Sequence, residues 1–318
     1  MDRYRLVGAL LAAAAACGYG TGPLLAKVIY PTGLDWLGLL FWRFLIGALL
    51  LWMLVLLVPS NRAGLRALTR RRVVAILGLG MFFVANAGTY FAGLMWISAS
   101  LASLIIYIYP ALVAVLSLRW GHGLQGRRPW LALAVVMVGV ALTIGGIETR
   151  AEPIGIVLLI VSPCCYAVYI VLSARFAGER RGVTATDRVD GEAVVPPVVM
   201  AAVMLIGTSA LTTAMAVAAG EPVLPWLVPA AAWPGLFGIA AVTTFAITAF
   251  YAGSARIGAA NAAVVATVEP VWTVSLAVIL LGESLGPVQL VGGALVLGGV
   301  LLAQTTPGAV VDAVHEEP

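Results

Sequence analysis

The sequence predicts an all-α membrane protein: ten transmembrane helices, arranged as two inverted five-helix repeats, with the N- and C-termini in the cytoplasm. Three observations predict this fold class, namely the composition, the spacing of the apolar runs and the distribution of charge between them. Of the 318 residues, 62% are hydrophobic and 10% are charged, and the mean hydropathy is +1.06. A soluble domain is roughly half apolar and about a quarter charged, so this chain cannot cover itself with polar surface. Lipid is therefore its expected solvent.

Ten apolar runs follow one another along the chain, separated by charges or by Pro/Gly turns. A helix crosses the hydrocarbon of a bilayer with about 20 apolar residues. The first run begins behind Arg3 and Arg5 like a secretory signal peptide, but it continues to about Ala26. Because that length spans a bilayer, we expect this run to be retained as a helix. The expected spans are 6–26, 36–58, 73–95, 98–118, 130–147, 154–174, 194–218, 231–253, 258–281 and 288–304.

Loop charges predict the orientation of these spans. With the N-terminus inside, fifteen arginines fall in the cytoplasmic loops, and only Lys27 and Arg150 fall in the opposite loops. Positive charge concentrates in the cytoplasmic loops of membrane proteins. Both ends are therefore expected in the cytoplasm, with residues 305–318 as a short cytoplasmic tail. The expected location is a bacterial cytoplasmic (inner) membrane, crossed many times.

The chain repeats itself at a shift of 160 positions, which places Pro110 on Pro270 and Gly139 on Gly299. The expected repeats are residues 7–145 and 155–304. Since each repeat holds five spans, an odd number, the second must lie upside down relative to the first. Inverted repeats are typical of secondary transporters, whose solute site lies near the bilayer midplane between the repeats.

Glu269 lies inside the ninth apolar run, in the stretch "VVATVEPVWTVSL". A charge at such depth costs about 2.5–3.5 kcal/mol on insertion scales unless it finds a partner, water or a proton. Pro270 removes a backbone hydrogen bond and predicts a helix kink, as Pro110 does in the first repeat. Glu269 is interpreted as a proton or substrate site, as a structural ion-pair partner, or as a protonated and hydrogen-bonded acid.

Arg43, about seven residues into the second run, is the natural partner for Glu269 in a buried ion pair or in coupling. Its side chain lies deeper than one that snorkels easily to the membrane surface. This position fits three roles: a structural salt bridge, a capped helix break, or attraction of an anionic group such as a carboxylate.

Aromatic and amide side chains at depth are the other candidates for a solute cavity. Asn86 either holds helices together or faces the solute, and Trp272 is a lid or mere packing. Buried phenols need hydrogen-bond partners, which makes deep tyrosines informative. The candidate cavity residues are Tyr19, Asn86, Tyr90, Tyr107, Tyr109, Tyr166, Glu269 and Trp272.

Two stretches carry a family resemblance. "FWRFLIGALLLWML" (Phe41–Leu54) and "EPVWTVSLAVILLGESL" (Glu269–Leu285) resemble the second and ninth helices of EamA-type carriers in the drug/metabolite transporter (DMT) superfamily. The resemblance implies a ten-helix carrier that moves small metabolites, amino acids or drugs by alternating access. It also implies a central cavity lined mainly by helices 1, 3, 4, 6, 8 and 9. Glu283 matches the acid that ends the family's ninth helix, and we interpret it as a loop-fixing or gating residue.

Two motifs that would indicate other functions are missing from the sequence. It contains no GxxxxGK[ST] pattern and no HExxH pattern, so we expect no ATP-driven step and no metal. We also expect no catalytic residues, no cofactor and no enzyme activity. The sequence contains no basic patch interleaved with aromatic residues, so we expect no binding of nucleic acid.

The expected function is secondary active or exchange transport of small metabolites, foremost amino acids or similar amphipathic solutes, in the export direction. The expected partners are a small-molecule solute, the lipid bilayer and, as a further candidate, a coupling proton; monomer and homodimer both remain open. One alternative is a lipid-intermediate or multidrug carrier of the same superfamily. An alternative of another class is a non-transporting membrane scaffold or sensor.

Overall fold

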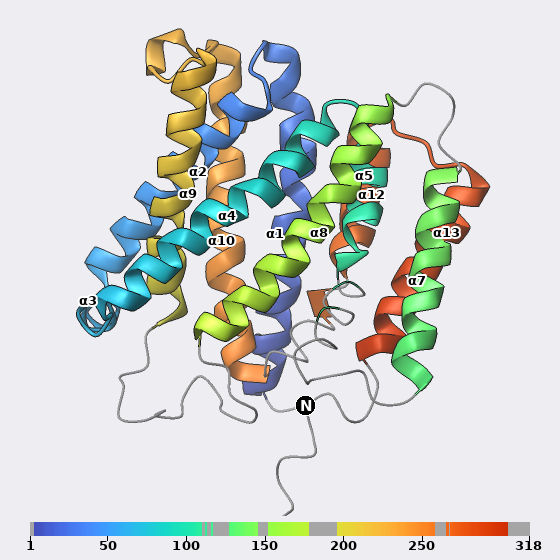
Figure 1. Ribbon diagram of the computed structural model, residues 1–318, viewed down its shortest axis with the longest axis horizontal. Coiled ribbons are helices and arrows are strands. Elements are labelled where there is room, and N and C mark those ends of the chain that lie inside the picture. The colour runs from blue at the N-terminus through green and yellow to red at the C-terminus, as the bar shows by residue number, and fades with distance from the viewer. Residues whose placement is uncertain are drawn as a thin grey trace, which may run out of the picture.

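The computed structural model describes residues 3–109, 112, 116, 127–145, 152–177, 196–257, 265–266 and 268–304. In these ranges every regular element is helical (Figure 1). Short 3₁₀ turns at Tyr30–Thr32, Pro225–Leu227 and Ala230–Ala232 lie between longer helices. The α-helices are α1 (Arg3–Ile29), α2 (Trp36–Leu57), α3 (Pro59–Arg66), α4 (Arg70–Leu94), α5 (Ala99–Ile106), α7 (Arg127–Gly145), α8 (Pro153–Ala177), α9 (Pro197–Ala219), α10 (Trp233–Ile257), α12 (Val268–Leu281) and α13 (Pro287–Gln304).

Among the residues that the structure describes, five segments are long and apolar enough to cross a membrane on their own. They are Leu6–Thr32, Trp36–Leu57, Arg70–Leu94, Val198–Ala219 and Ala230–Phe250. Shorter apolar helices cover Pro153–Tyr169, Val268–Leu281 and Pro287–Gly299. The prediction of a helical membrane protein is therefore confirmed, whereas the count of ten spans and the orientation of the termini stay predictions. Pro110 lies outside the described residues, so its kink stays a prediction too.

Side chains just ahead of the helices fix several of their starts. Asp35 accepts hydrogen bonds from the backbone N–H groups of Leu37 and Gly38, at 2.7 and 3.0 Å, and so caps α2. Ser98 caps α5 by accepting from the N–H of Leu101 at 3.3 Å. Capping matters here because the first N–H groups of a helix have no partner within it.

Glycines allow helices distant in sequence to approach closely. A Cβ atom on Gly18 of α1 would lie 3.0 Å from the Cβ of Ala246 on α10. A Cβ on Gly80 of α4 would overlap the backbone oxygen of Met204 on α9. Helix association in lipid depends on such packing, because lipid tails are as apolar as the side chains that they contact. These contacts explain why α1 lies along α10 and α4 crosses α9 (Figure 1).

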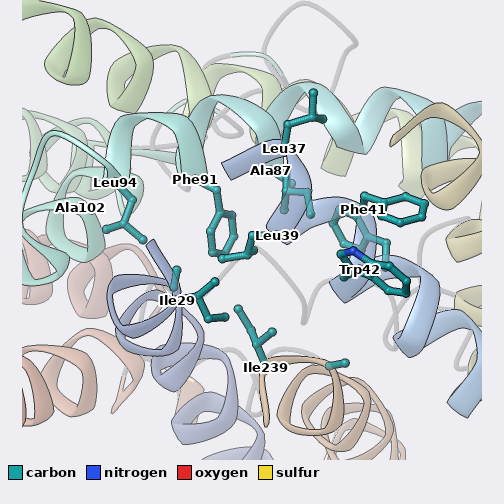
Figure 2. Close-up of a cluster of buried hydrophobic side chains, with 14 of the residues drawn as sticks. Ile29, Leu37, Leu39, Phe41, Trp42, Ala87, Phe91, Leu94, Ala102 and Ile239 are labelled. Carbon is teal, nitrogen blue, oxygen red and sulfur yellow. The ribbon is translucent and has the colours of Figure 1, made fainter. Parts of the chain in front are cut away.

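A core cluster surrounds α2, where Leu39, Leu40 and Leu51 are fully buried. Figure 2 shows Phe91 of α4 among Ile29, Leu39 and Ile239. Many large aliphatic side chains also lie on the outer surface of the helices. Leu57 and Ile279, for example, are 68% and 74% exposed. So much exposed aliphatic surface requires lipid around the helices.

Candidate functional site

Arg43 on α2 brings a guanidinium group into the interior. Its Cζ atom lies 4.7 Å from the ring centroid of Phe91 and 5.5 Å from that of Phe44. The Nε and Nη1 atoms are buried without a hydrogen-bond partner. Since buried donors normally are paired, this guanidinium keeps binding capacity toward an anion or water.

Glu269 lies in the first turn of α12 and is half-buried. The Tyr107 hydroxyl, just after α5, lies 3.2 Å from Oε2 of Glu269 and donates a hydrogen bond to it. The same hydroxyl lies 3.3 Å from the backbone oxygen of Ala266. The next residue, Pro270, is buried within α12. The acid is therefore held at a junction between two helices that are far apart in sequence.

A continuous series of rings links these two ionisable side chains. Ring centroids lie 5.9 Å apart for Tyr107 and Tyr109, and 4.7 Å apart for Tyr109 and Tyr166. Tyr166 and Tyr169 of α8 lie 6.0 Å apart with nearly parallel planes. The series then runs through α4 to α2, with centroid distances of 5.2 Å and 6.2 Å. We call these six side chains the aromatic row: Tyr107, Tyr109, Tyr166, Tyr169, Phe83 and Phe44.

Two further predicted tyrosines lie close to the aromatic row. The Tyr90 phenol of α4 is within electrostatic range of both Glu269 and Arg43. The Tyr19 phenol of α1 is within electrostatic range of Arg43 and Tyr166. All five predicted cavity tyrosines and both predicted ionisable residues therefore gather in one region. Their role as solute contacts stays a prediction.

Asn86 and Trp272 make direct contacts between helices. Oδ1 of the buried Asn86 accepts a hydrogen bond from the Ser162 hydroxyl of α8 at 2.8 Å. Nε1 of Trp272 donates to Oγ1 of Thr21 on α1 at 3.1 Å. Both contacts fit the helix-packing alternative for these residues. Contact with a solute stays a prediction for each of them.

Glu283, in the loop between α12 and α13, closes the start of α5. Its two carboxylate oxygens accept hydrogen bonds from the backbone N–H groups of Ala99 and Ser100, at 2.8 and 2.9 Å. A carboxylate at a helix N-terminus pairs orphan donors and complements the helix dipole. The loop-fixing interpretation predicted such a contact but could not name the partner. Together with the Tyr107–Glu269 hydrogen bond beyond the other end of α5, it ties this helix to the α12 region at two points.

Some residues of this region were not singled out from the sequence. Ser162 lies four positions before Tyr166, hence on the same face of α8, and that spacing could have indicated it. The Tyr30 hydroxyl donates to the backbone oxygen of Phe91 at 2.7 Å, which supports the ring that covers Arg43. Nothing in the local sequence indicates this second contact.

A pair of acids lies outside the candidate spans, where α2 begins and α9 ends. Burial raises the pKa of the Glu221 carboxyl, and the neighbouring Asp35 carboxyl raises it further. Among the described residues, no group of three or more His, Cys, Asp and Glu could hold a metal ion.

Comparison with known proteins identifies the family. A sequence model of the EamA-like transporter family matches residues 6–145 and 153–305. The transporter YcbK of Bacillus subtilis, described as uncharacterized, is 27% identical over 291 residues, which cover 88% of this chain and 85% of that protein. An uncharacterized transporter of Archaeoglobus fulgidus is 26% identical over 233 residues, 72% of this chain and 75% of its own.

A solved crystal structure shares the fold. It aligns with a TM-score of 0.63 at 20% identity, covering 94% of this chain and 97% of the other. The family match extends over nearly the whole sequence, and the apolar helices described above fit its membrane setting. This chain therefore belongs to the EamA-like transporter family of the DMT superfamily, as a multi-pass membrane transporter rather than an enzyme.

Proposed function

We propose that the protein is a secondary active or exchange transporter that exports small amphipathic metabolites, foremost amino acids, by alternating access. In this proposal residues 7–145 and 155–304 form two inverted repeats of five membrane-spanning helices each. Both termini lie in the cytoplasm, and the membrane is a bacterial inner membrane. Support for the orientation comes from the arginines at the start of α1, around α3 and at the end of α10, which lie at one end of the molecule (Figure 1).

The aromatic row between Arg43 and Glu269 is the observation that carries the proposal. A guanidinium group pairs well with a carboxylate. A half-buried carboxylate with tyrosine rings beside it suits an ammonium group, through charge and through cation–π contact. The aromatic rings beside these two groups suit an apolar side chain on the same solute. A zwitterion with an apolar side chain matches these three features better than a polyanion does, because a polyanion calls for several clustered cations.

Alternating access requires contacts that can break. The Tyr107–Glu269 hydrogen bond and the Glu283 cap on α5 both join segments more than a hundred positions apart in the sequence. In the proposed cycle, protonation of Glu269 weakens its hold on the solute ammonium group, and this couples transport to a proton. In the arrangement that the structure describes, no hydrogen bond from Nε or Nη1 of Arg43 reaches Glu269. Pairing of the two is proposed for another step of the cycle.

Counterflow in proteoliposomes tests this function. Purified protein would be reconstituted with pooled amino acids, other metabolites or cationic drugs inside the vesicles. Uptake of labelled solute would then be compared for wild type, Glu269→Gln and Glu152→Gln, a control that removes an exposed acid just before α8. We expect uptake of an amino acid, and we expect Glu269→Gln alone to abolish its response to a pH gradient.

The same assay separates the alternatives. Uptake of drugs in place of amino acids would favour the multidrug alternative. Absence of flux for every pool, with folded protein confirmed, would contradict solute transport and favour a lipid-intermediate carrier or a scaffold. If Glu269→Gln still transports solute with an unchanged pH response, the protein is a carrier but Glu269 has a structural role.

A further inference from the structure

A cluster of exposed arginines lies between α2 and α4, beside the short helix α3. Arg62 and Arg66 belong to α3, and Arg70 and Arg71 begin α4. All four are exposed, and we call them the arginine ridge. We infer that the arginine ridge is a binding surface for the headgroups of anionic phospholipids.

The position of α3 is fixed by its packing against α9. Asn61 and Gly64 are buried, and a Cβ atom on Gly64 would overlap the ring of Pro196 directly before α9. Residues one turn apart lie on the same face of a helix. Because Asn61 and Gly64 occupy the buried face, Arg62 and Arg66 share the exposed one. Arg62 and Arg66 thus project from the same face of a helix whose opposite face is packed against the protein.

The apolar surface of the molecule ends beside the arginine ridge. Leu56 and Leu57, the last residues of α2, are 56% and 68% exposed. Val74, in the first turn and a half of α4, is 62% exposed. Exposed aliphatic side chains this close to exposed arginines place the arginine ridge at the depth where acyl chains give way to phosphate groups. Arginine is well suited to phosphate there, since its fork of N–H donors matches phosphate oxygens.

The arginine ridge has no acidic neighbours nearby in the chain. The sequence contains no Asp or Glu from residue 36 to residue 147. Among the described residues, the four arginines make no ion pair with an acid. Clusters of basic residues immediately beside a membrane-spanning helix typically attract anionic lipids. A lipid headgroup is therefore the occupant that both the charge and the depth favour.

Lipid selectivity of the reconstituted full-length protein tests this inference. Spin-labelled phosphatidylglycerol and spin-labelled phosphatidylcholine would be compared, as the fraction of each that is immobilised at the protein. The test variant is R62Q/R66Q. The matched control is R3Q/R127Q, which removes the same charge from two exposed arginines elsewhere. We expect wild type and the control to prefer phosphatidylglycerol. In the test variant, the binding ratio of phosphatidylglycerol to phosphatidylcholine should fall about fivefold for each arginine removed.

Further measurements keep the result unambiguous. R62K/R66K retains charge without the guanidinium fork and is expected to keep part of the preference, which guards against misfolding of the neutral variant. Equal losses in R62Q/R66Q and R3Q/R127Q would overturn the inference in favour of diffuse charge attraction. Displacement of the labelled lipid by inorganic phosphate would overturn it in favour of a soluble anion. A lipid preference that appears only after Glu179, Asp187, Asp190 and Glu192 are neutralised would identify the segment between α8 and α9 as the occupant instead.

Discussion

The phenol of Tyr107 and the carboxylate of Glu269 are joined by a hydrogen bond of 3.2 Å. Tyr107 follows α5 in the first half of the chain, and Glu269 lies in the first turn of α12 in the second. The bond lies at one end of the aromatic row, whose other end reaches Arg43. Any rearrangement that moves α5 relative to α12 must stretch or break this bond, so it is a sensitive point for testing the proposed cycle.

Removing the hydroxyl of Tyr107 should change the pH response of transport more than it changes folding. Tyr107→Phe keeps the ring and its contact with Tyr109 but removes a hydrogen bond worth about 1 kcal/mol. We expect the pH at which counterflow is half-maximal to shift. Tyr169→Phe, at the far end of the tyrosines, is the control and should leave that pH unchanged. An identical profile for wild type and both variants would contradict a coupling role for the Tyr107–Glu269 pair.

Arg43 should determine whether a solute needs a carboxylate. Arg43→Gln removes the buried cation, and we expect the KM for amino acids to rise at least tenfold. Transport of the corresponding decarboxylated amines should change little. The protein should remain as stable as before, since the guanidinium leaves two buried donors unpaired. Equal effects on acids and amines would show that Arg43 has a structural role.

Glu283 should stabilise the start of α5. Glu283→Gln replaces one acceptor oxygen by a donor and removes the charge near the helix N-terminus, at a cost of about 1–2 kcal/mol. Thermal unfolding in detergent should show a lower midpoint for this variant. Glu152→Gln, an exposed acid at the start of α8, should unfold as wild type does. If both variants match wild type, the cap contributes nothing to stability.

The α4–α9 crossing should not tolerate a methyl group at Gly80. A Cβ atom there would overlap the backbone oxygen of Met204, whereas one on Gly78 would meet no atom within 4 Å. Overpacking of this kind typically costs about 1–3 kcal/mol. Gly80→Ala should therefore unfold at lower denaturant or temperature, and Gly78→Ala should not. Comparable stability of the two variants would contradict the close approach of these helices.

The acid pair of Asp35 and Glu221 should make the protein less stable as pH rises. The pKa of Glu221 is raised above 4.5, mainly by burial and further by Asp35. The folded protein therefore holds a proton at pH values where the unfolded chain has released it, and stability falls as pH rises through that range. Glu221→Gln should flatten this part of the stability–pH curve. An unchanged slope in the variant would assign the dependence to other groups.

The fold class and much of the candidate site could be predicted from the sequence. Composition and run length are enough to predict membrane helices, because a helix needs about 20 consecutive apolar residues to cross the hydrocarbon of a bilayer. Depth within those runs was enough to select Tyr107, Tyr109, Tyr166 and Glu269, since polar groups are costly there. The gathering of these side chains follows from the packing of α5, α8 and α12.

Individual partners could not be predicted in the same way. The contact of Glu283 with Ala99 joins residues 184 positions apart, and no local pattern encodes such a pairing. Asn86 left two readings open because an amide suits a helix interface and a cavity equally well. Its partner Ser162 is on α8, and only the three-dimensional arrangement could identify this partner.

The position of α1 has a consequence for the biogenesis of the protein. This helix leaves the ribosome before α10 and α12, yet Gly18 packs against Ala246 of α10, and the Thr273 hydroxyl of α12 donates to the backbone oxygen of Gly20. Its small-residue face therefore has no native partner until α10 and α12, in the last third of the given sequence, have been translated. During that interval α1 depends on lipid, on other helices or on the insertion machinery to cover this face. A product truncated before α10 would leave this face of α1 without its native partner helices.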